Sequence, residues 1–131
     1  MGERSPVRGL TLDTGALIAF ERGDAKMRQL LREAFQAEAR VIIPAGVVVQ
    51  VWRDGRRQVE LGTVLRASNV QVDPLTASLA MAVGELCARR GASDVIDASV
   101  VLAARRFGGA VVTSDPDDIY GLDPSLRVRR V

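Results

Sequence analysis

The sequence predicts an α/β protein in which a central, mainly parallel, twisted sheet of four to five strands carries helices on both faces. Short apolar runs recur along the chain, and segments with apolar residues at helical spacing separate them. Glycine, proline and aspartate stand at the junctions. Strands that alternate with helices in this way form βαβ units, whose sheet is parallel and covered on both sides. Because the chain has 131 residues and no repeat or linker, we expect one domain.

The first half of the chain predicts two strands and four helices. The first apolar run ends in Asp13, after which a Thr-Gly turn leads into a short apolar helix. Asp24 is a favoured N-cap for a helix with an apolar stripe. Pro44 stops the second strand and opens a helix that ends before Gly55, and an arginine pair begins the next helix. In order, the expected elements are a strand at residues 8–13, helices at 16–20 and 25–37, a strand at 41–43, and helices at 44–53 and 56–67.

The second half predicts three strands and two helices. Pro74 closes the third strand, and Gly91 ends the apolar helix that follows it. The pair Gly108 and Gly109 breaks the next helix ahead of a fourth apolar strand. The last segment alternates arginine with valine, which is typical of a strand with two different faces. In order, the expected elements are a strand at residues 70–72, helices at 75–90 and 93–104, and strands at 110–113 and 127–131.

The helix at residues 93–104 is apolar on almost every side, which predicts that it is buried. Its first turn nevertheless carries Asp94 and Asp97, which lie three residues apart and therefore on one face. Buried carboxylates are costly unless a cation or a metal compensates their charge, so we expect positive charge beside them. The alternative is that Ser93 or Asp94 caps the helix and that Asp97 stabilises its positive N-terminal end.

The residue types present restrict the chemistry. The chain has no histidine, which excludes Ser-His-Asp and Cys-His catalysis and histidine-ligated zinc. Carboxylates remain as metal ligands, and such hard oxygen donors suit Mg²⁺ or Mn²⁺. Cys87 is the only cysteine, which predicts a buried thiol without an internal disulfide and a cytoplasmic location. The start of the chain lacks a signal-peptide pattern, and no run is long and apolar enough to span a membrane.

Two further acids follow expected strands. Asp13 ends the first strand and Asp115 follows the fourth. Right-handed crossovers place the carboxyl ends of parallel strands at one edge of the sheet, where α/β proteins bind ligands, so both acids should emerge together. Asp94 and Asp97 join them only if their helix and the helix before it together make the crossover, with the second helix beginning at this edge. Such a cluster would require a divalent cation, which activates water and clamps phosphate oxygens. The alternative is that Asp13 only caps the following helix.

Three motifs stand in order along the chain: LDTGALI at residues 12–18, DASVVLAA at residues 97–104 and VTSDPDDI at residues 112–119. With these motifs the chain resembles, over essentially its whole length, the PIN-domain endoribonucleases, specifically the VapC-type toxins of prokaryotic toxin–antitoxin pairs. The resemblance implies a single PIN-like domain over residues 1–131 and Mg²⁺-dependent hydrolysis of RNA by metal-activated water, with Mn²⁺ as a second suitable cation. It also implies a VapB-type antitoxin and a second copy of the chain that cover the apolar helices between residues 25 and 67, and no membrane association.

The resemblance also assigns roles to individual residues. The metal-binding and catalytic acids would be Asp13, Asp97, Asp115 and, as an accessory acid one turn before Asp97, Asp94. Asp118 matches a frequent acid of the family that braces the loop. Thr113 would form a hydrogen bond near the site.

One position departs from the family pattern. The family places a glutamate on the helix after the second strand, and the matching residue here is Gln50. An amide oxygen can orient water or a ligand, but it offers no negative charge to a cation. The departure puts a second tightly bound metal in doubt, and Asp94 would then restore the missing charge. It also favours the alternative of a PIN-fold RNA- or protein-binding module with weakened or no catalysis.

Basic residues suggest how RNA would be held. Lys26 is the only lysine, and arginine forms the pairs Arg56-Arg57, Arg89-Arg90 and Arg105-Arg106. Any pair that flanks the acidic edge could hold the RNA backbone, and otherwise these pairs are solvated faces. A phosphatase or receiver-like domain is another alternative, but such domains usually add a lysine or a nucleophile at a strand end, whereas Lys26 belongs to an outer helix.

Overall fold

The structure, a computed structural model, describes residues 9–131. Arg8, where the first strand was expected to begin, lies outside the described residues. So does the start of the chain, on which the expected lack of a signal peptide rests. A single domain over residues 1–131 therefore stays a prediction.

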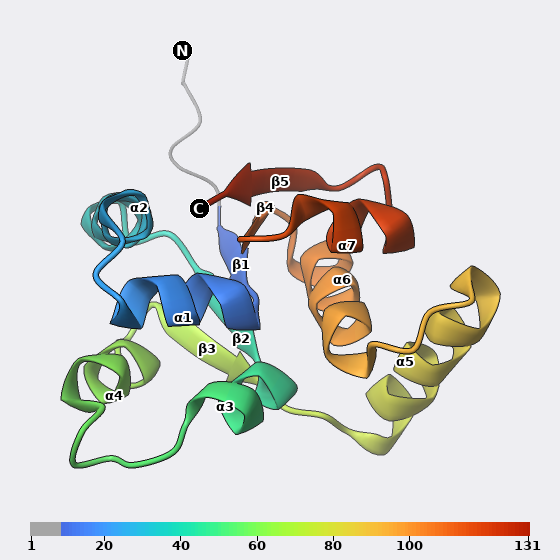
Figure 1. Ribbon diagram of the computed structural model, residues 1–131, viewed down its shortest axis with the longest axis horizontal. Helices are drawn as coiled ribbons and strands as arrows, with labels where there is room; N and C mark the ends of the chain where they lie inside the picture. Colours follow the sequence, from blue (N-terminus) through green and yellow to red (C-terminus); the bar gives the residue numbers. More distant parts are fainter. Residues whose placement is uncertain (1–8) are drawn as a thin grey trace.

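The described residues form five strands in one sheet, in the order β3-β2-β1-β4-β5 (Figure 1). Every neighbouring pair of strands is parallel. The strands are β1 (Leu10–Leu12), β2 (Val41–Pro44), β3 (Val70–Asp73), β4 (Ala110–Thr113) and β5 (Arg127–Arg130). This arrangement confirms the predicted α/β fold with a parallel sheet. The direction of the strand order reverses between β1 and β4.

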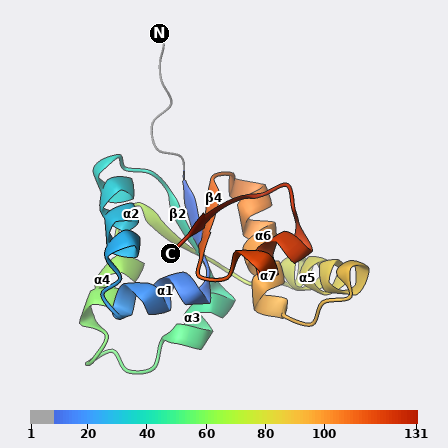
Figure 2. The ribbon, with the colours of Figure 1, turned by 45° about the horizontal axis from the view of Figure 1, so that its top comes forward.

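Seven helices occur within residues 9–131, and they cover both faces of the sheet. Figures 1 and 2 show α1, α2 and α4 on one side of the sheet and α5, α6 and α7 on the other. The helices are α1 (Thr14–Glu21), α2 (Ala25–Gln36), α3 (Ala45–Val51), α4 (Val59–Leu65), α5 (Ala77–Arg90), α6 (Val95–Phe107) and α7 (Pro116–Leu122). None of the described helices is long and apolar enough to cross a membrane.

The core lies on both faces of the central strands. All residues of β1, β2 and β4 are buried, as expected for parallel strands covered on both sides. Helix α6 packs against β1, β2 and β4, and six of its side chains are buried, which confirms that it is an inner helix. Cys87 is buried and unpaired, as predicted.

Both α5 and α6 lie between β3 and β4 in the chain, so together they make the crossover. The second of them ends beside the start of β4, where the Ala110 amide donates to the carbonyl oxygen of Gly9 at 3.2 Å. It therefore begins at the opposite edge, next to the carboxyl ends of the strands. Asp94 and Asp97, in and just before the first turn of α6, therefore lie at the same edge of the sheet as Asp13 and Asp115.

Helix α7 is an element that the sequence reasoning did not include. It is short, and only Ile119 and Leu122 are buried on it, which is too few to show a helical period. The usable signal was a proline at the first helical position followed by acids in the first turn. Its end is fixed to α6 because Arg105 Nε donates to the carboxylate of Asp123 at 2.6 Å.

Helix α4 begins later than predicted, at Val59 instead of residue 56. The residues before it form a turn, in which the amides of Arg57 and Gln58 both donate to the Asp54 carbonyl at 3.0 Å. The Gln58 side chain closes this turn by accepting from the Arg53 amide at 2.7 Å. The other boundaries lie within a few residues of those predicted.

Candidate metal centre

Asp13 stands at the carboxyl end of β1, beside the point where the strand order reverses. Its amide donates to the Val112 carbonyl of β4 at 3.2 Å, and its carboxylate accepts from the Ala16 amide at 2.8 Å. It is therefore both the N-cap of α1 and a buried acid, with 7 % of its surface exposed. Burial raises the pKa of Asp13, whereas hydrogen bonds from Thr113 and Ala16 lower it in part.

Asp115 follows β4 at the same edge of the sheet. Its amide donates to the Thr113 hydroxyl at 2.9 Å, and Thr113 is also one of the groups that lower the pKa of Asp13, so Thr113 lies near both acids. The role that the resemblance gives to Thr113 stays a prediction. The exposed Asp115 side chain makes no capping bond to α7, although it occupies the N-cap position, so its carboxylate stays available to a ligand.

Asp97 lies in the first turn of α6 and is partly buried. Burial, followed by the charges of Asp94, Asp118 and Asp13, raises the pKa of Asp97 to about 7. Asp94 is the N-cap of α6, because its carboxylate accepts from the Asp97 amide at 2.9 Å. Both interpretations of Asp94 therefore fit its position: it caps the helix and it adds charge beside Asp97.

Asp118 lies in the first turn of α7 and faces the same acids. Desolvation and the nearby Asp115 raise the pKa of Asp118. It is exposed, and it acts on Asp13 and Asp97 through its charge. The acids from β1, α6, the end of β4 and α7 therefore lie near enough for the charge of one to raise the pKa of another.

The cluster fits a hard divalent cation by its donors and by its charge. None of its carboxylates takes part in an ion pair within residues 9–131. Asp13 is buried and Asp97 is partly buried, and unpaired carboxylates in such surroundings favour a compensating cation. Carboxylate oxygens are the ligands that Mg²⁺ and Mn²⁺ prefer. As the side chains of the described residues are placed, no three of them converge closely enough to hold one ion.

Gln50 lies at the rim of this cluster. The Thr14 hydroxyl, one residue after Asp13, donates to Gln50 Oε1 and so joins α1 to α3. Helix α3 also approaches α6 closely, because a Cβ atom at Gly46 would lie 2.5 Å from Ile96 Cδ1. The resemblance to PIN domains singles out Gln50. The sequence gives Thr14 no role beyond a turn, because its hydrogen-bond partner is 36 residues away.

A close approach between the start of α1 and the segment after β4 completes this edge. The backbone of Gly15, at the start of α1, lies so near Ser114 that a Cβ atom would overlap the serine hydroxyl. The absence of a side chain at Gly15 lets the segment after β4 lie against the start of α1. This contact places Asp115 next to Asp13.

Beside the cluster is a cavity of about 330 Å³ between α5, α6 and α7, which we call the acidic pocket. It is lined by Arg90, Ala92, Ser93, Asp94, Asp97, Asp117, Asp118, Gly121 and Leu122. Sequence reasoning gave no role to Asp117, although it lies within the third motif, and did not single out Arg90 from the other paired arginines.

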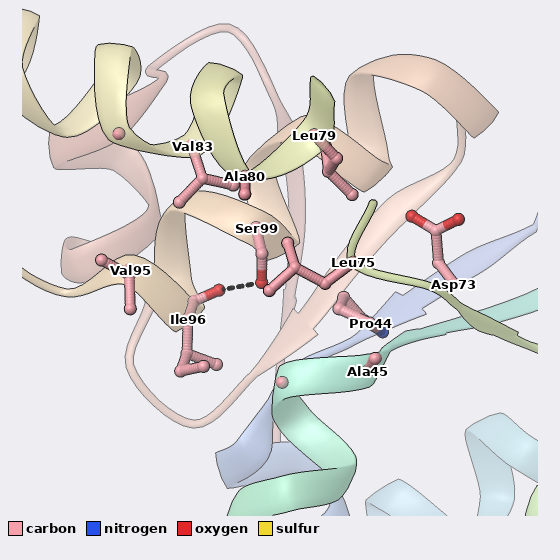
Figure 3. A pocket seen from close by; sticks show the side chains of 12 residues that line it. Pro44, Ala45, Asp73, Leu75, Leu79, Ala80, Val83, Val95, Ile96 and Ser99 are labelled. Atoms are coloured by element: carbon pink, nitrogen blue, oxygen red, sulfur yellow. Dashed lines mark hydrogen bonds between the residues drawn. The ribbon is translucent and has the colours of Figure 1, made fainter. Parts of the chain in front are cut away.

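A second cavity, of about 230 Å³, lies between α3, α5 and α6 and is mainly apolar (Figure 3). The Ser99 hydroxyl in its wall already donates to the Ile96 carbonyl at 2.6 Å. Asp73, also in the wall, lies 3.6 Å from the Arg106 guanidinium. These two polar groups have partners within the protein.

Comparisons with known proteins identify the family and agree with the α/β fold. A family model described as PIN domain matches residues 10–123. The structure is similar to that of VapBC2 from Rickettsia felis bound to a promoter DNA fragment, with a TM-score of 0.67 and 16 % identity over 94 % of this chain and 98 % of that one.

Two further solved structures are similar. FitAcB from Neisseria gonorrhoeae gives a TM-score of 0.63 and 16 % identity, with 91 % of this chain and 95 % of that chain covered. FitAB bound to an IR36 DNA fragment gives 0.64 and 13 % identity, with 92 % and 94 % covered. At these identities the likeness shows the fold. No curated protein sequence matches that of this chain.

Proposed function

Because the chain belongs to the PIN-domain family, we propose that it is a metal-dependent endoribonuclease of the VapC toxin type. One observation carries this proposal: buried Asp13, partly buried Asp97 and exposed Asp115 stand at the sheet edge where the strand order reverses, and no arginine or lysine pairs with them in the described chain. Open α/β sheets bind ligands at such a point.

The acids that would hold Mg²⁺ or Mn²⁺ are Asp13, Asp97, Asp115 and Asp94. When bound, a divalent cation supplies a water of lowered pKa and charge compensation for the phosphodiester. The protein supplies position: Ala16 and Thr113 hold the Asp13 carboxylate, and the buried helix α6 holds Asp97. Asp118 adds negative charge near Asp13 and Asp97.

The test is cleavage of RNA by the purified protein. We expect a structured RNA to be cut in Mg²⁺ and left intact in EDTA, and we expect Asp13→Asn and Asp97→Asn each to abolish cutting. Asp24→Asn is the matched control, because asparagine still caps α2 and the residue lies away from the cluster. Cutting that persists in both site variants would refute the assignment of these residues.

The proposed partners are an antitoxin of the VapB type and a second copy of this chain. Support comes from the similar solved structures, which are VapBC and FitAB proteins. A groove of about 390 Å³ between α2 and α4 is open to such a partner, and exposed Phe35 and Val59 line it. Light scattering of the purified chain tests the second copy, and co-expression with a neighbouring small gene product tests the antitoxin. A cytoplasmic location agrees with the single buried thiol.

The alternative is a PIN-fold binding module with weakened or no catalysis. It is favoured by Gln50, which stands where the family has glutamate and whose amide oxygen already accepts from Thr14. Calorimetric titration with Mn²⁺ separates the two functions. Heat of binding that disappears in Asp97→Asn supports the nuclease, and no binding of Mn²⁺ or Mg²⁺ supports the module.

A further inference from the structure

Arg90 differs in its surroundings from the other paired arginines. It lines the acidic pocket together with Asp94, Asp97, Asp117 and Asp118. It is the one basic residue in the wall of this pocket. No ion pair holds it within residues 9–131.

The other arginines of the three pairs are engaged elsewhere or lie outside the pocket. Arg105 bonds Asp123 at 2.6 Å, and Arg106 lies 3.6 Å from Asp73 and 4.8 Å from the centre of the Phe107 ring. Arg57 lies 3.8 Å from Asp54. Arg56 and Arg89 do not line the acidic pocket.

The end of α5 sets the backbone position of Arg90, whose side chain is exposed. The Ala92 amide donates to the Cys87 carbonyl at 2.9 Å, which closes the helix just after Arg90. Leu86 and Cys87 are buried, so the last turn of α5 is anchored in the core. The start of α6 follows after a short link, which keeps Arg90 beside Asp94.

The charges of the pocket pose a problem for an RNA substrate. A phosphodiester in this pocket would lie among its four carboxylates, and like charges repel it. A guanidinium offers both a compensating charge and a planar pair of donors that matches two phosphate oxygens. Arg90 is placed to do this on the α5 side of the cluster.

We propose that Arg90 binds a backbone phosphate of RNA next to the phosphate that is cleaved, so that the strand leaves the metal centre through the acidic pocket. The proposal rests on the proposed function, because it requires RNA as the substrate. Arg90 would be a substrate-binding residue, separate from the acids that hold the metal.

The experiment compares Arg90→Ala with Arg89→Ala. These neighbours carry the same charge at the end of the same helix, but only Arg90 lines the pocket. Binding of a labelled single-stranded RNA is followed by fluorescence anisotropy at several salt concentrations in Ca²⁺, and a denaturing gel confirms that the RNA stays intact. We expect the slope of log affinity against log salt to fall by about 0.7 in Arg90→Ala and to stay unchanged in Arg89→Ala.

Further measurements keep the result decisive. Arg90→Lys retains the charge and should retain the slope while binding more weakly, which separates loss of the guanidinium from loss of folding. If both alanine variants show the wild-type slope of log affinity against log salt, the proposal is overturned. It is also overturned if Arg90→Ala changes only the affinity for Mn²⁺, because Arg90 would then only balance the charge of the acids. If wild type neither binds nor cuts RNA, the proposed function itself fails, whereas cutting with equal slopes refutes only the role of Arg90.

Discussion

The carboxyl group of Asp97 titrates near neutral pH in the metal-free protein, because burial and then the charges of Asp94, Asp118 and Asp13 raise its pKa to about 7. A carboxylate in such surroundings is poised to release its proton when a cation arrives, because the cation favours the charged form. In the proposed metal centre, metal binding and proton release are therefore coupled at this residue, and the pH dependence of metal binding tests that centre.

We predict that the metal-free protein loses stability as the pH rises from about 4 to about 7. The pKa of Asp97 is raised from 3.8 in the unfolded chain to about 7 in the folded one, so the folded state binds more protons in this interval. Its contribution is fully present below the lower value and is lost as the pH passes the higher one. Asp13, whose pKa is also raised, acts in the same direction.

Urea unfolding in EDTA at pH 5 and pH 8 measures this effect. We expect a lower midpoint at pH 8 in wild type and a smaller difference in Asp97→Asn. Asp123 works in the opposite direction, because hydrogen bonds from Ser125 and Arg105 lower its pKa to about 2, but its contribution is lost only at more acidic pH. Equal midpoints at pH 5 and pH 8 would contradict the prediction.

Asp94 allows its two roles to be separated by the choice of substitution. Asparagine caps a helix about as well as aspartate, so Asp94→Asn should leave thermal stability nearly unchanged while it removes a charge from the cluster. Asp94→Ala removes the cap as well and should cost about 1 kcal/mol of folding free energy. We expect both variants to weaken Mn²⁺ binding several-fold by calorimetry. If Asp94→Asn keeps full metal affinity and cleavage, Asp94 is only a cap.

The candidate site acids could be picked out from the sequence because each stands at the boundary of a helix or strand. At such boundaries, both helix capping and ligand binding favour aspartate. Asp13 and Asp94 turned out to cap helices and to face the cluster as well, so the two interpretations were never exclusive. The bond between Thr14 and Gln50 could not be predicted, because no local pattern joins residues so distant in the chain.

At the scale of elements, the strands were predicted well because parallel strands buried on both faces are short continuous apolar runs. Helix α7 was not predicted, because it is too short for apolar residues to repeat at helical spacing. In such a short helix, the cap and the first turn are the main sequence signals. The sequence predicts helix in place of the turn before α4, because the hydrogen bonds of this turn depend on the Gln58 side chain, which composition does not reveal.

The junction between α6 and β4 gives a sharp test of local backbone geometry. Gly108 and Gly109 both have positive φ, at 78° and 86°. A Cβ atom at Gly108 would meet nothing within 4 Å, whereas one at Gly109 would overlap the backbone carbonyl of Gly9. Gly108 has a ψ of −175° as well, a conformation nearly restricted to glycine, so we expect Gly108→Ala to cost about 1–3 kcal/mol from strain alone. Gly109→Ala should cost clearly more, because the backbone of Gly9 cannot move without disturbing its bond to Ala110.

Chemical denaturation of the two glycine variants under identical conditions provides the measurement. Gly108→Ala serves as the matched control, since it shares the positive φ and lacks the overlap. Similar losses in the two variants would mean that the chain before β1 moves aside, and the close approach would then not fix this junction.

At the scale of the whole molecule, the alternation of strands and helices predicted the fold class but not the order of strands. The order β3-β2-β1-β4-β5 puts β1 and β4 side by side, and this adjacency brings Asp13 and Asp115 together. The resemblance to PIN domains implied that these acids act together, and crossover handedness alone placed them only at the same edge. The net charge of +2 does not reveal that acidic residues are concentrated at this edge of the sheet.

This clustering of acidic residues predicts that divalent cations stabilise the folded protein as a whole. An ion that binds only the folded state stabilises it by about 2.7 kcal/mol at a concentration one hundred times its dissociation constant. We therefore expect Mn²⁺ or Mg²⁺ to raise the melting temperature of wild type by several degrees, and more at pH 8 than at pH 5, because protonated Asp97 must release its proton to bind.

The control is KCl at matched ionic strength, which screens exposed charges without occupying the site. Asp13→Asn combined with Asp97→Asn should melt at a temperature that does not respond to Mn²⁺, and should be more stable than wild type in EDTA at pH 8, because the repulsion is relieved. If KCl reproduces the whole effect in wild type, the carboxylates respond only to screening and no metal site exists. A rise specific to divalent cations that disappears in the double variant would link the arrangement of the sheet to the binding of metal.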